Sequence, residues 1–297
     1  MELRVLQYFL MVAREENITR AAQLLHVTQP TLSRQLMQLE EELGVELFAR
    51  SNHAIALTDD GMLLKRRAQE IVTLAEKTKQ EFSRQENTLA GEIAIGSGEL
   101  RCMSFLSEML SAFHERYPLV RYELYSGNAD SIKEQIEKGL LDLGLLVEPV
   151  DISKYAFIRL PLKEEWGVVT HKNGELAGKE SVTPEELSRL PLLMTKRPIV
   201  QNELANWFGH ERFEQLDIVA TYNLLYNAAM LVREGMGHAV CLRLDTYFDD
   251  LYFLPFSPAM LTSSVLGWKK NQRMSPATNA FLEFALIYIK SISDDST

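Results

Sequence analysis

The chain of 297 residues is poor in cysteine and has no long uncharged apolar run. Its two cysteines, Cys102 and Cys241, lie 139 positions apart, which argues against a disulfide framework and against a CxxC metal or redox motif. The best candidate for a membrane span, FLEFALIYI from Phe281, contains Glu283 and falls short of the roughly 18 apolar residues required. A basic-then-apolar N-terminal leader is also missing. We therefore expect a cytoplasmic protein that does not enter a membrane.

The motifs of common enzyme sites are missing as well. The segments Gly96-Ser-Gly98 and Gly235-Met-Gly237 lack the third glycine of GxGxxG, so a dinucleotide site is not expected. None of the six histidines forms HExxH or pairs with another at i, i+4, which leaves a metal site with little support. No GxSxG nucleophile motif occurs. These absences predict a protein that is not an enzyme and that needs no cofactor or metal.

The charge is acidic overall but unevenly distributed. A net charge of −10 argues, taken alone, against a nucleic-acid partner. Residues 1–90, however, carry 11 Lys and Arg against 13 Asp and Glu, so most of the acidity lies downstream. Within residues 17–39 there is no acidic residue, whereas Arg20, His26 and Arg34 are present. Such a window suggests a surface kept clear for an anion, although chance explains it about as well.

Two helices joined by a tight turn are predicted in this window. The first covers about residues 18–25 and buries Ala21 and Ala22, whose small side chains allow another helix to cross closely. Thr28 can cap the second helix, and Pro30 fits its first turn, where its missing N–H costs nothing. Leucines then recur every four residues on one face. The side chains left pointing outward are Thr31, Ser33, Arg34 and Gln35, with Gln29 and Gln38 at the flanks.

This order of elements is typical of a helix-turn-helix, whose second helix reads base edges in the major groove from its N-terminal half. Gln can pair with adenine, Arg with guanine, and Thr can contact a thymine methyl group. A solvated helix face is the competing interpretation, because exposed helices also carry Thr, Ser and Gln. The agreement of turn, cap and acid-free face favours DNA binding. Arg20 is included in the expected DNA surface, whereas Glu40–Glu42 should point away from it.

A long helix should follow. Thr58, Asp59 and Asp60 form a capped, acidic first turn, and no proline occurs up to about Asn87. A helix of about 30 residues would be about 45 Å long. Its apolar and small residues alternate steps of four and three, as in a heptad seam; packing on its own domain is the alternative, which the length disfavours. A two-stranded seam would set two recognition helices about 34 Å apart and predicts an inverted-repeat DNA site. The expected dimerisation residues are Leu64, Ala68, Ile71, Ala75 and Phe82.

Beyond residue 89 the pattern changes to alternating short strands and helices, which predicts an α/β fold with parallel strands. The first set contains GEIAIGS, VRYELYS and LDLGLLV, and the second contains EWGVVTH, PLLMT, LDIVAT and HAVCL. The final helix, over 275–292, has no strand of its own nearby and should return to the first set. The chain would then cross between two lobes near residues 160–165 and 264–268.

Ligands of such sheets bind beyond the carboxyl ends of the strands, often against helix N-termini. Three loops qualify by position. The candidate residues for a small-molecule effector are Ser97, Gly98, Glu99, Ser126, Asn128, Thr195, Lys196, Tyr222 and Asn223. An ordinary helix cap is an equally good interpretation of any single one of them. Glu99 would disfavour a simple anionic effector unless Lys196 or Arg197 compensates for its charge.

The stretch NITRAAQLLHVTQPTLSRQLMQLEEELGVELFARS, residues 17–51, resembles the LysR-type transcriptional regulators, and the resemblance extends more loosely along the whole chain. It implies a winged helix-turn-helix, a long linker helix and a two-lobed effector-binding domain with the fold of periplasmic solute-binding proteins. The DNA-binding residues that it implies are Thr28, Gln29, Pro30, Thr31, Ser33 and Arg34 on the recognition helix, and Arg50 and His53 on the wing. One departure is Arg243, where many members have proline.

The expected organisation is thus a DNA-binding domain over 1–58, a linker helix over 59–88 and an effector-binding domain over 89–297. Lobe I would comprise 89–162 and 266–297, and lobe II would comprise 163–265. The expected function is a sequence-specific transcriptional regulator controlled by a small molecule bound between the lobes. Its expected partners are double-stranded DNA with an inverted repeat, the effector, RNA polymerase and further copies of the chain in a homodimer or homotetramer.

Two alternatives stay open at this point. Cys102 lies near a helix N-terminus, where a thiol pKa can be lowered, so the chain could instead be a redox-responsive regulator. Buried cysteines, however, are usually inert. The second alternative is a small-molecule-binding or catalytic protein whose N-terminal domain serves only assembly.

Overall fold

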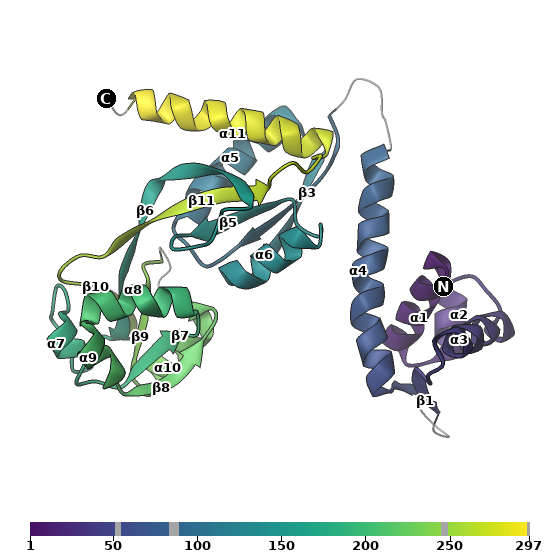
Figure 1. Cartoon of the computed structure of the whole chain (residues 1–297), viewed down its shortest axis with the longest axis horizontal. Coiled ribbons are helices and arrows are strands. Elements are labelled where there is room, and N and C mark those ends of the chain that lie inside the picture. Colours follow the sequence, from purple (N-terminus) through teal and green to yellow (C-terminus); the bar gives the residue numbers. More distant parts are fainter. Residues whose placement is uncertain (51–54, 83–88, 245–248, 296–297) are drawn as a thin grey trace. The chain divides into compact units, whose positions relative to one another are not determined.

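The computed structural model describes residues 1–50, 55–82, 89–244 and 249–295, and the chain forms two compact units, residues 1–84 and 85–297. The first unit is mainly helical, and the second is an α/β domain (Figure 1). Within the described ranges, no helix has both the length and the apolar character needed to cross a membrane.

Three helices pack around one apolar core in the first unit. They are α1 (Leu3–Glu15), α2 (Ile18–Leu24) and α3 (Gln29–Leu43). Asn17 caps α2 by accepting the N–H of Arg20 at 2.9 Å. Thr28 caps α3, and Pro30 lies in the first turn of this helix, both as predicted. One face of α3 is fully buried through Leu32, Leu36 and Leu39, so the opposite face is left for other partners.

A two-stranded antiparallel sheet follows α3, and it is tied to the end of that helix by one carboxylate. The strands are β1 (Phe48–Arg50) and β2 (Ile55–Leu57). Glu40 Oε1 accepts the backbone N–H groups of Leu47 at 2.8 Å and Phe48 at 3.2 Å. Glu40 therefore holds the entry of the sheet against α3. The sequence pattern had given this residue only a place away from DNA.

The first half of the long helix α4 (Asp59–Phe82) belongs to the same core. Ala68 is fully buried there, and Leu64 packs against the core from its edge. A Cβ atom on Gly61 would come within 2.1 Å of the carbonyl oxygen of Leu47, so only glycine allows this approach. The expectation that Ala68 lines a dimer seam is therefore wrong, because its side chain is used inside the chain. Ile71 is 41% exposed.

The second unit contains nine strands in its described part, in the order β4-β3-β5-β11-β6-β9-β7-β8, with β10 paired to β6. The strands are β3 (Gly91–Ser97), β4 (Val120–Ser126), β5 (Leu143–Val147), β6 (Tyr155–His171), β7 (Leu192–Thr195), β8 (Ile218–Tyr222), β9 (His238–Leu242), β10 (Leu251–Pro255) and β11 (Leu261–Lys269). Strands β3, β4 and β5 are parallel and form lobe I, and β7, β8 and β9 are parallel and form lobe II.

The helices of this unit are α5 (Cys102–Arg116), α6 (Ala129–Glu137), α7 (Pro184–Leu187), α8 (Pro198–Phe208), α9 (His210–Glu214), α10 (Leu225–Arg233) and α11 (Pro276–Asp295). The last helix returns to lobe I, where Phe281 and Ala285 are fully buried in the core that includes α5 and β3 (Figure 1). This return was expected from the absence of a strand near the C-terminal helix.

Strands β6 and β11 connect the two lobes. The 17-residue β6 pairs with β11 in its first part and with β9 and β10 in its second part. Trp268 of β11 lies opposite Ala156, and Leu261 lies opposite Glu165. Two crossing strands therefore join the lobes. The predicted fold class, a helix-turn-helix unit followed by a two-lobed α/β domain, is confirmed.

Candidate functional site

The N-terminal half of α3 presents a polar surface. Its candidate DNA-binding residues Thr28, Gln29, Pro30, Thr31 and Arg34 are exposed, and Ser33 is half-buried. The Oγ1 atoms of Thr28 and Thr31 lie 2.8 Å apart, and Gln29 Nε2 donates to Ser33 Oγ at 3.0 Å. Arg34 makes no hydrogen bond or ion pair with any residue that the structure describes. Its guanidinium group is therefore available to an external anion or base.

The other candidate DNA contacts are less well placed or lie outside what the structure describes. Arg20 is exposed, but its Nε is 2.9 Å from Glu15 Oε2, so a carboxylate just before the acid-free window already neutralises it. The backbone of Arg50 lies in β1, and its side chain is not described. His53 lies outside the described residues. Phe82, an expected dimerisation residue, is the last residue of α4, and its side chain is not among those described.

A cavity of about 110 Å³ lies in the second unit, where strand ends of both lobes meet. Six of the expected effector-binding residues line it: Gly98, Glu99, Asn128, Thr195, Tyr222 and Asn223. Apolar side chains from both lobes complete the wall, among them Leu145, Val147 and Val200. The arrangement suits a small ligand with a mostly apolar body, held by a few polar groups.

Three other candidates do not line the cavity. The Ser97 hydroxyl donates to the carbonyl oxygen of Gly98 at 2.8 Å. Ser126 is exposed at the end of β4, which is an edge strand of the sheet. Lys196 is exposed, and the neighbouring Arg197 lines the cavity in its place. Proximity to a strand end therefore indicates which loops border the cavity but not which of their side chains line it.

Two further lining residues carry polar groups: Arg197, which was expected only to compensate for the charge of Glu99, and Trp166, which was not expected at all. Arg197 is only 8% exposed and lies directly before α8, a position at which the sequence offered two adjacent cations. Trp166 of β6 is 4% exposed, and its Nε1 has no acceptor within the described part of the chain. No sequence signal singles out Trp166, because it lies in an apolar strand like many core residues.

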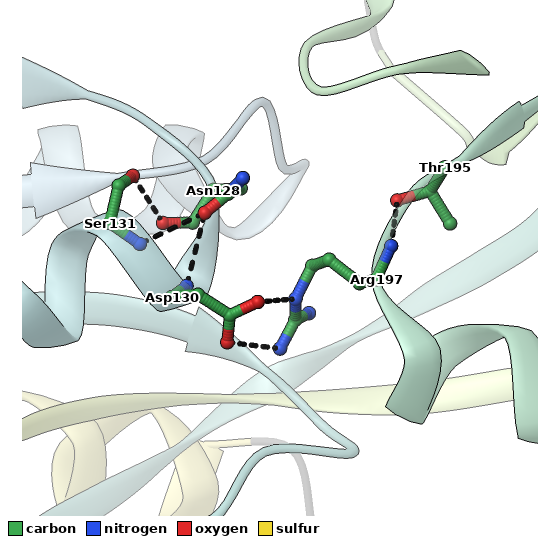
Figure 2. Close-up of polar contacts among 5 residues, drawn as sticks. All are labelled: Asn128, Asp130, Ser131, Thr195 and Arg197. Atoms are coloured by element: carbon green, nitrogen blue, oxygen red, sulfur yellow. Dashed lines mark hydrogen bonds and ion pairs between the residues drawn. The ribbon is translucent and has the colours of Figure 1, made fainter.

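Arg197 joins the two lobes through an ion pair with Asp130 of α6. Its Nε and Nη2 donate to the two carboxylate oxygens at 3.2 and 3.5 Å, and Figure 2 shows the two side chains pointing toward one another. Asn128 caps α6 by accepting the N–H groups of Asp130 and Ser131. The backbone N–H of Arg197 donates to Thr195 Oγ1 at 3.4 Å. Both partners of the ion pair are thus positioned by caps and turns of their own lobes.

A second contact joins the lobes through Glu99. Its carboxylate accepts the backbone N–H of Leu225, the first residue of α10. Leu224, at the capping position, offers no side-chain hydrogen bond to this helix. Burial, with further contributions from Cys241 and the charge of Glu99, holds the pKa of the Tyr222 hydroxyl well above its usual value. The Tyr222 hydroxyl therefore stays protonated and donates to the Val240 carbonyl.

The thiol of Cys102 is buried at the start of α5 and is not set up for redox chemistry. Its Sγ donates to the Leu162 carbonyl at 3.4 Å. Burial raises the pKa of the Cys102 thiol to about 12, and the nearby negative charge of Glu164 adds to this effect. A raised pKa leaves little of the reactive thiolate at neutral pH. No group of three or more His, Cys, Asp or Glu side chains that could hold a metal occurs among the described residues.

We expect Cys102 to react with iodoacetamide about 1,000-fold more slowly in the native chain than in the unfolded chain near pH 8. The fraction of thiolate falls about tenfold for each unit by which the pKa is raised, and the reactivity should recover only as the pH approaches 12. The measurement is mass-spectrometric labelling of a Cys241→Ser variant, in which Cys102 is the remaining thiol. Rapid native labelling, or oxidation by micromolar peroxide, would restore the redox alternative.

Comparison with known proteins agrees with this organisation. Residues 3–62 match the family model of the bacterial regulatory helix-turn-helix proteins of the lysR family, and residues 86–288 match the LysR substrate binding domain. The HTH-type transcriptional regulator BsdA of Bacillus subtilis is 30% identical over 294 residues, covering 95% of this chain and 99% of that protein. The Hca operon transcriptional activator HcaR of Escherichia coli is 30% identical over 305 residues, covering 99% and 100%.

Solved structures show the same fold. The crystal structure of CbnR, a LysR family transcriptional regulator, has a TM-score of 0.74 at 21% identity and covers 97% of this chain and 99% of its own. Full-length CbnR in complex with its target DNA has a TM-score of 0.72 at 23% identity, covering 96% and 98%. The two family models together span nearly the whole chain. The chain therefore belongs to the LysR family of transcriptional regulators, with a DNA-binding helix-turn-helix and a substrate-binding domain.

Proposed function

We propose that the chain binds an inverted-repeat DNA site as a dimer and that a small molecule in the cleft of the second unit controls this binding. The proposal of DNA binding rests on the exposed face of the N-terminal half of α3, which has no acidic residue and on which Arg34 has no partner among the described residues. Gln29, Thr31, Ser33 and Arg34 would reach base edges. Thr28 and Pro30 lie at the helix N-terminus, which favours a nearby phosphate.

Further DNA contacts are proposed outside α3. Arg50 and His53 are proposed as phosphate contacts of the wing from the family resemblance alone. Arg20 would contribute once it leaves its ion pair with Glu15. CbnR has been solved with its target DNA, which supports double-stranded DNA as the partner here. We place the chain in the cytoplasm with its DNA, with RNA polymerase as a further partner.

The proposed dimer seam lies on the exposed apolar face of α4. Leu63, Ile71 and Leu74 are 53%, 41% and 44% exposed. At roughly 100° per residue they fall within an arc of about 80°, beside the face that packs on the core. Leu64 and Ala75 border this face and stay in the proposed seam, as does Phe82, whereas Ala68 is removed from it. The assembly would be a homodimer or a homotetramer.

The proposed domain boundaries remain those expected from the sequence, with a DNA-binding domain over 1–58, a linker helix over 59–88 and an effector-binding domain over 89–297. The cleft between lobe I (89–162 and 266–297) and lobe II (163–265) would hold the effector. Because Glu99 and Arg197 each contact the opposite lobe, a ligand that changes either contact shifts the population of lobe arrangements. Such a shift is the proposed means by which the effector changes DNA binding.

Selection of DNA fragments by the full-length chain tests the proposed function. We expect a few fragments to be enriched at physiological salt and footprinting to show two protected half-sites centred about 34 Å apart. The measurement is sequencing of the bound pool followed by footprinting. Retention of fragments without any sequence preference would contradict a regulator and favour a domain that serves assembly only.

A double variant of α4 tests the proposed dimer interface without altering α3, the helix proposed to contact the bases. Ile71→Asp combined with Leu74→Asp should convert the dimer to a monomer in sedimentation and lose the paired footprint, because it places charge in the proposed apolar seam. Gln69→Asp adds a carboxylate at an exposed position on a different side of α4 and should leave both readings unchanged. A dimer that survives the double variant would place the interface elsewhere.

A further inference from the structure

The cleft of the second unit is closed at two points by side chains of the chain itself. Glu99 of lobe I accepts an N–H of lobe II at Leu225, and Asp130 of lobe I pairs with Arg197 of lobe II at 3.2 Å. Each contact sets a carboxylate of lobe I against a donor of lobe II. A ligand that enters between the lobes must therefore meet donors that already hold carboxylates.

Several of the polar groups on the otherwise apolar wall of the cavity are hydrogen-bond donors. The helices α6, α8 and α10 begin beside it, and each contains at least nine residues. A helix N-terminus carries unpaired N–H groups and the positive end of the helix dipole. Arg197 adds a guanidinium group, whose charge is paired with the Asp130 carboxylate. Trp166 also lines the cavity, is almost completely buried, and has an Nε1–H without an acceptor in the described residues.

The N-terminus of α10 already binds a carboxylate. Ser, Thr, Asp or Asn usually caps a helix, but here the capping position is Leu224, which provides no side-chain hydrogen bond. Glu99 supplies the missing acceptor from the other lobe. The helix end is therefore a carboxylate-binding position that the chain fills with its own side chain.

A cationic ligand paired with Glu99 is the alternative. The positive ends of the helix dipoles disfavour such a ligand, and Glu99 would have to leave the N–H of Leu225 unpaired. An anionic ligand replaces one acceptor by another, and it can also supply an acceptor to Trp166. The polar groups of the cleft thus favour ligands that bring acceptors.

We infer that Glu99 is an internal competitor of the effector, which is a small carboxylate with a compact apolar body that displaces Glu99 from the N-terminus of α10. This inference rests on the proposed role of the cleft as the effector site. The apolar body would lie against Leu145, Val147 and Val200, which line the cavity of about 110 Å³. Displacement of Glu99 separates α10 from lobe I. Glu99 thereby sets both the effector concentration needed and the preference for negative charge.

The test compares a matched series of probes, pentanoate, pentanamide and pentylamine, on the full-length chain and on Glu99→Gln. Glutamine keeps the size of the side chain but is a weaker, uncharged acceptor. Pentanoate should bind Glu99→Gln about tenfold more tightly than the unchanged chain in calorimetric titration, as expected when a charged hydrogen-bonding competitor is removed. Pentylamine should gain no affinity. Glu108→Gln, which removes the same charge from an exposed position of α5, should leave pentanoate binding unchanged.

Hydrogen exchange gives a readout that needs no ligand. The amide of Leu225 should exchange at least about tenfold faster in Glu99→Ala than in the unchanged chain, because it loses its acceptor. Unchanged exchange, tighter pentylamine binding to the unchanged chain than to Glu99→Gln, or absence of pentanoate binding to Glu99→Gln would each overturn the inference. DNA selection by the same proteins is independent of these readings, so a failure there would contradict the proposed function and not the role of Glu99.

Discussion

Replacing Arg34 by alanine is expected to weaken binding of the full-length chain to its selected DNA site by about 100-fold. The Arg34 guanidinium is exposed on the N-terminal half of α3 and has no partner among the described residues. A bidentate contact of arginine with guanine discriminates by about 1–3 kcal/mol, and a dimer makes the contact twice, so a loss of roughly 3 kcal/mol follows. Competition gel shifts at one fixed salt concentration measure the change.

The loss should be specific to sequence and to position. Base preference should relax at one position of each half-site, whereas binding to unrelated DNA should change little. Arg67→Ala is the matched control, because it removes the same charge from α4, where the Arg67 guanidinium lies 3.0 Å from Glu70. Its effect on site affinity should be small. If Arg34→Ala kept both the affinity and the base preference, a different surface would have to read the DNA.

Replacing Glu164 by alanine should lower the free energy of unfolding of the second unit by about 3 kcal/mol. Glu164 lies on the crossing strand β6 and has no exposed surface. Its carboxylate accepts the N–H groups of Arg101 at 3.1 Å and Cys102 at 2.9 Å, and the hydroxyl of Ser264 at 3.2 Å. Alanine leaves these donors without the carboxylate and opens a cavity, and both effects destabilise the folded state.

Urea unfolding followed by tryptophan fluorescence measures this change. All three tryptophans of the chain lie in the second unit, so their signal reports that unit alone. Glu165→Ala is the control, since its carboxylate forms a partly exposed ion pair with Arg243 and its loss should cost no more than about 1 kcal/mol. A cost below about 1 kcal/mol for Glu164→Ala would mean that other groups or water satisfy the donors.

The helix-turn-helix could be predicted because its signals are local. Thr28 caps α3 from the position just before it, and Pro30 lies in the first turn of the same helix. The buried leucines of α3 also repeat within this one helix. The seam of α4 could not be resolved in the same way. Gly61 and Ala68 fit a heptad, but they pack against the chain's own core. The period of a pattern gives the face of a helix and does not identify what covers it.

The cleft was predictable in outline for a related reason. The ends of parallel strands meet in space, so the loops carrying Glu99, Asn128 and Thr195 could be placed together before their contacts were known. Whether Lys196 or Arg197 lines the cavity depends on how the chain turns after β7. Side chains alternate between the two faces only within a strand, so this pattern does not predict which of the two points into the cavity. The hydrogen bond from Leu225 to Glu99 joins residues 126 positions apart, and nothing in either segment announces it.

The tie between Glu40 and the strand that follows α3 bears on how such a regulator can change over evolutionary time. The buried leucines of α3 and the carboxylate of Glu40 fix the helix and the small sheet as one body. The outward residues of the N-terminal half of α3, which are proposed to read DNA, lie outside this core. New operator preferences can therefore arise by substitution on one face of α3 while the folded scaffold stays as it is, which makes a duplicated gene of this kind easy to redirect to another promoter.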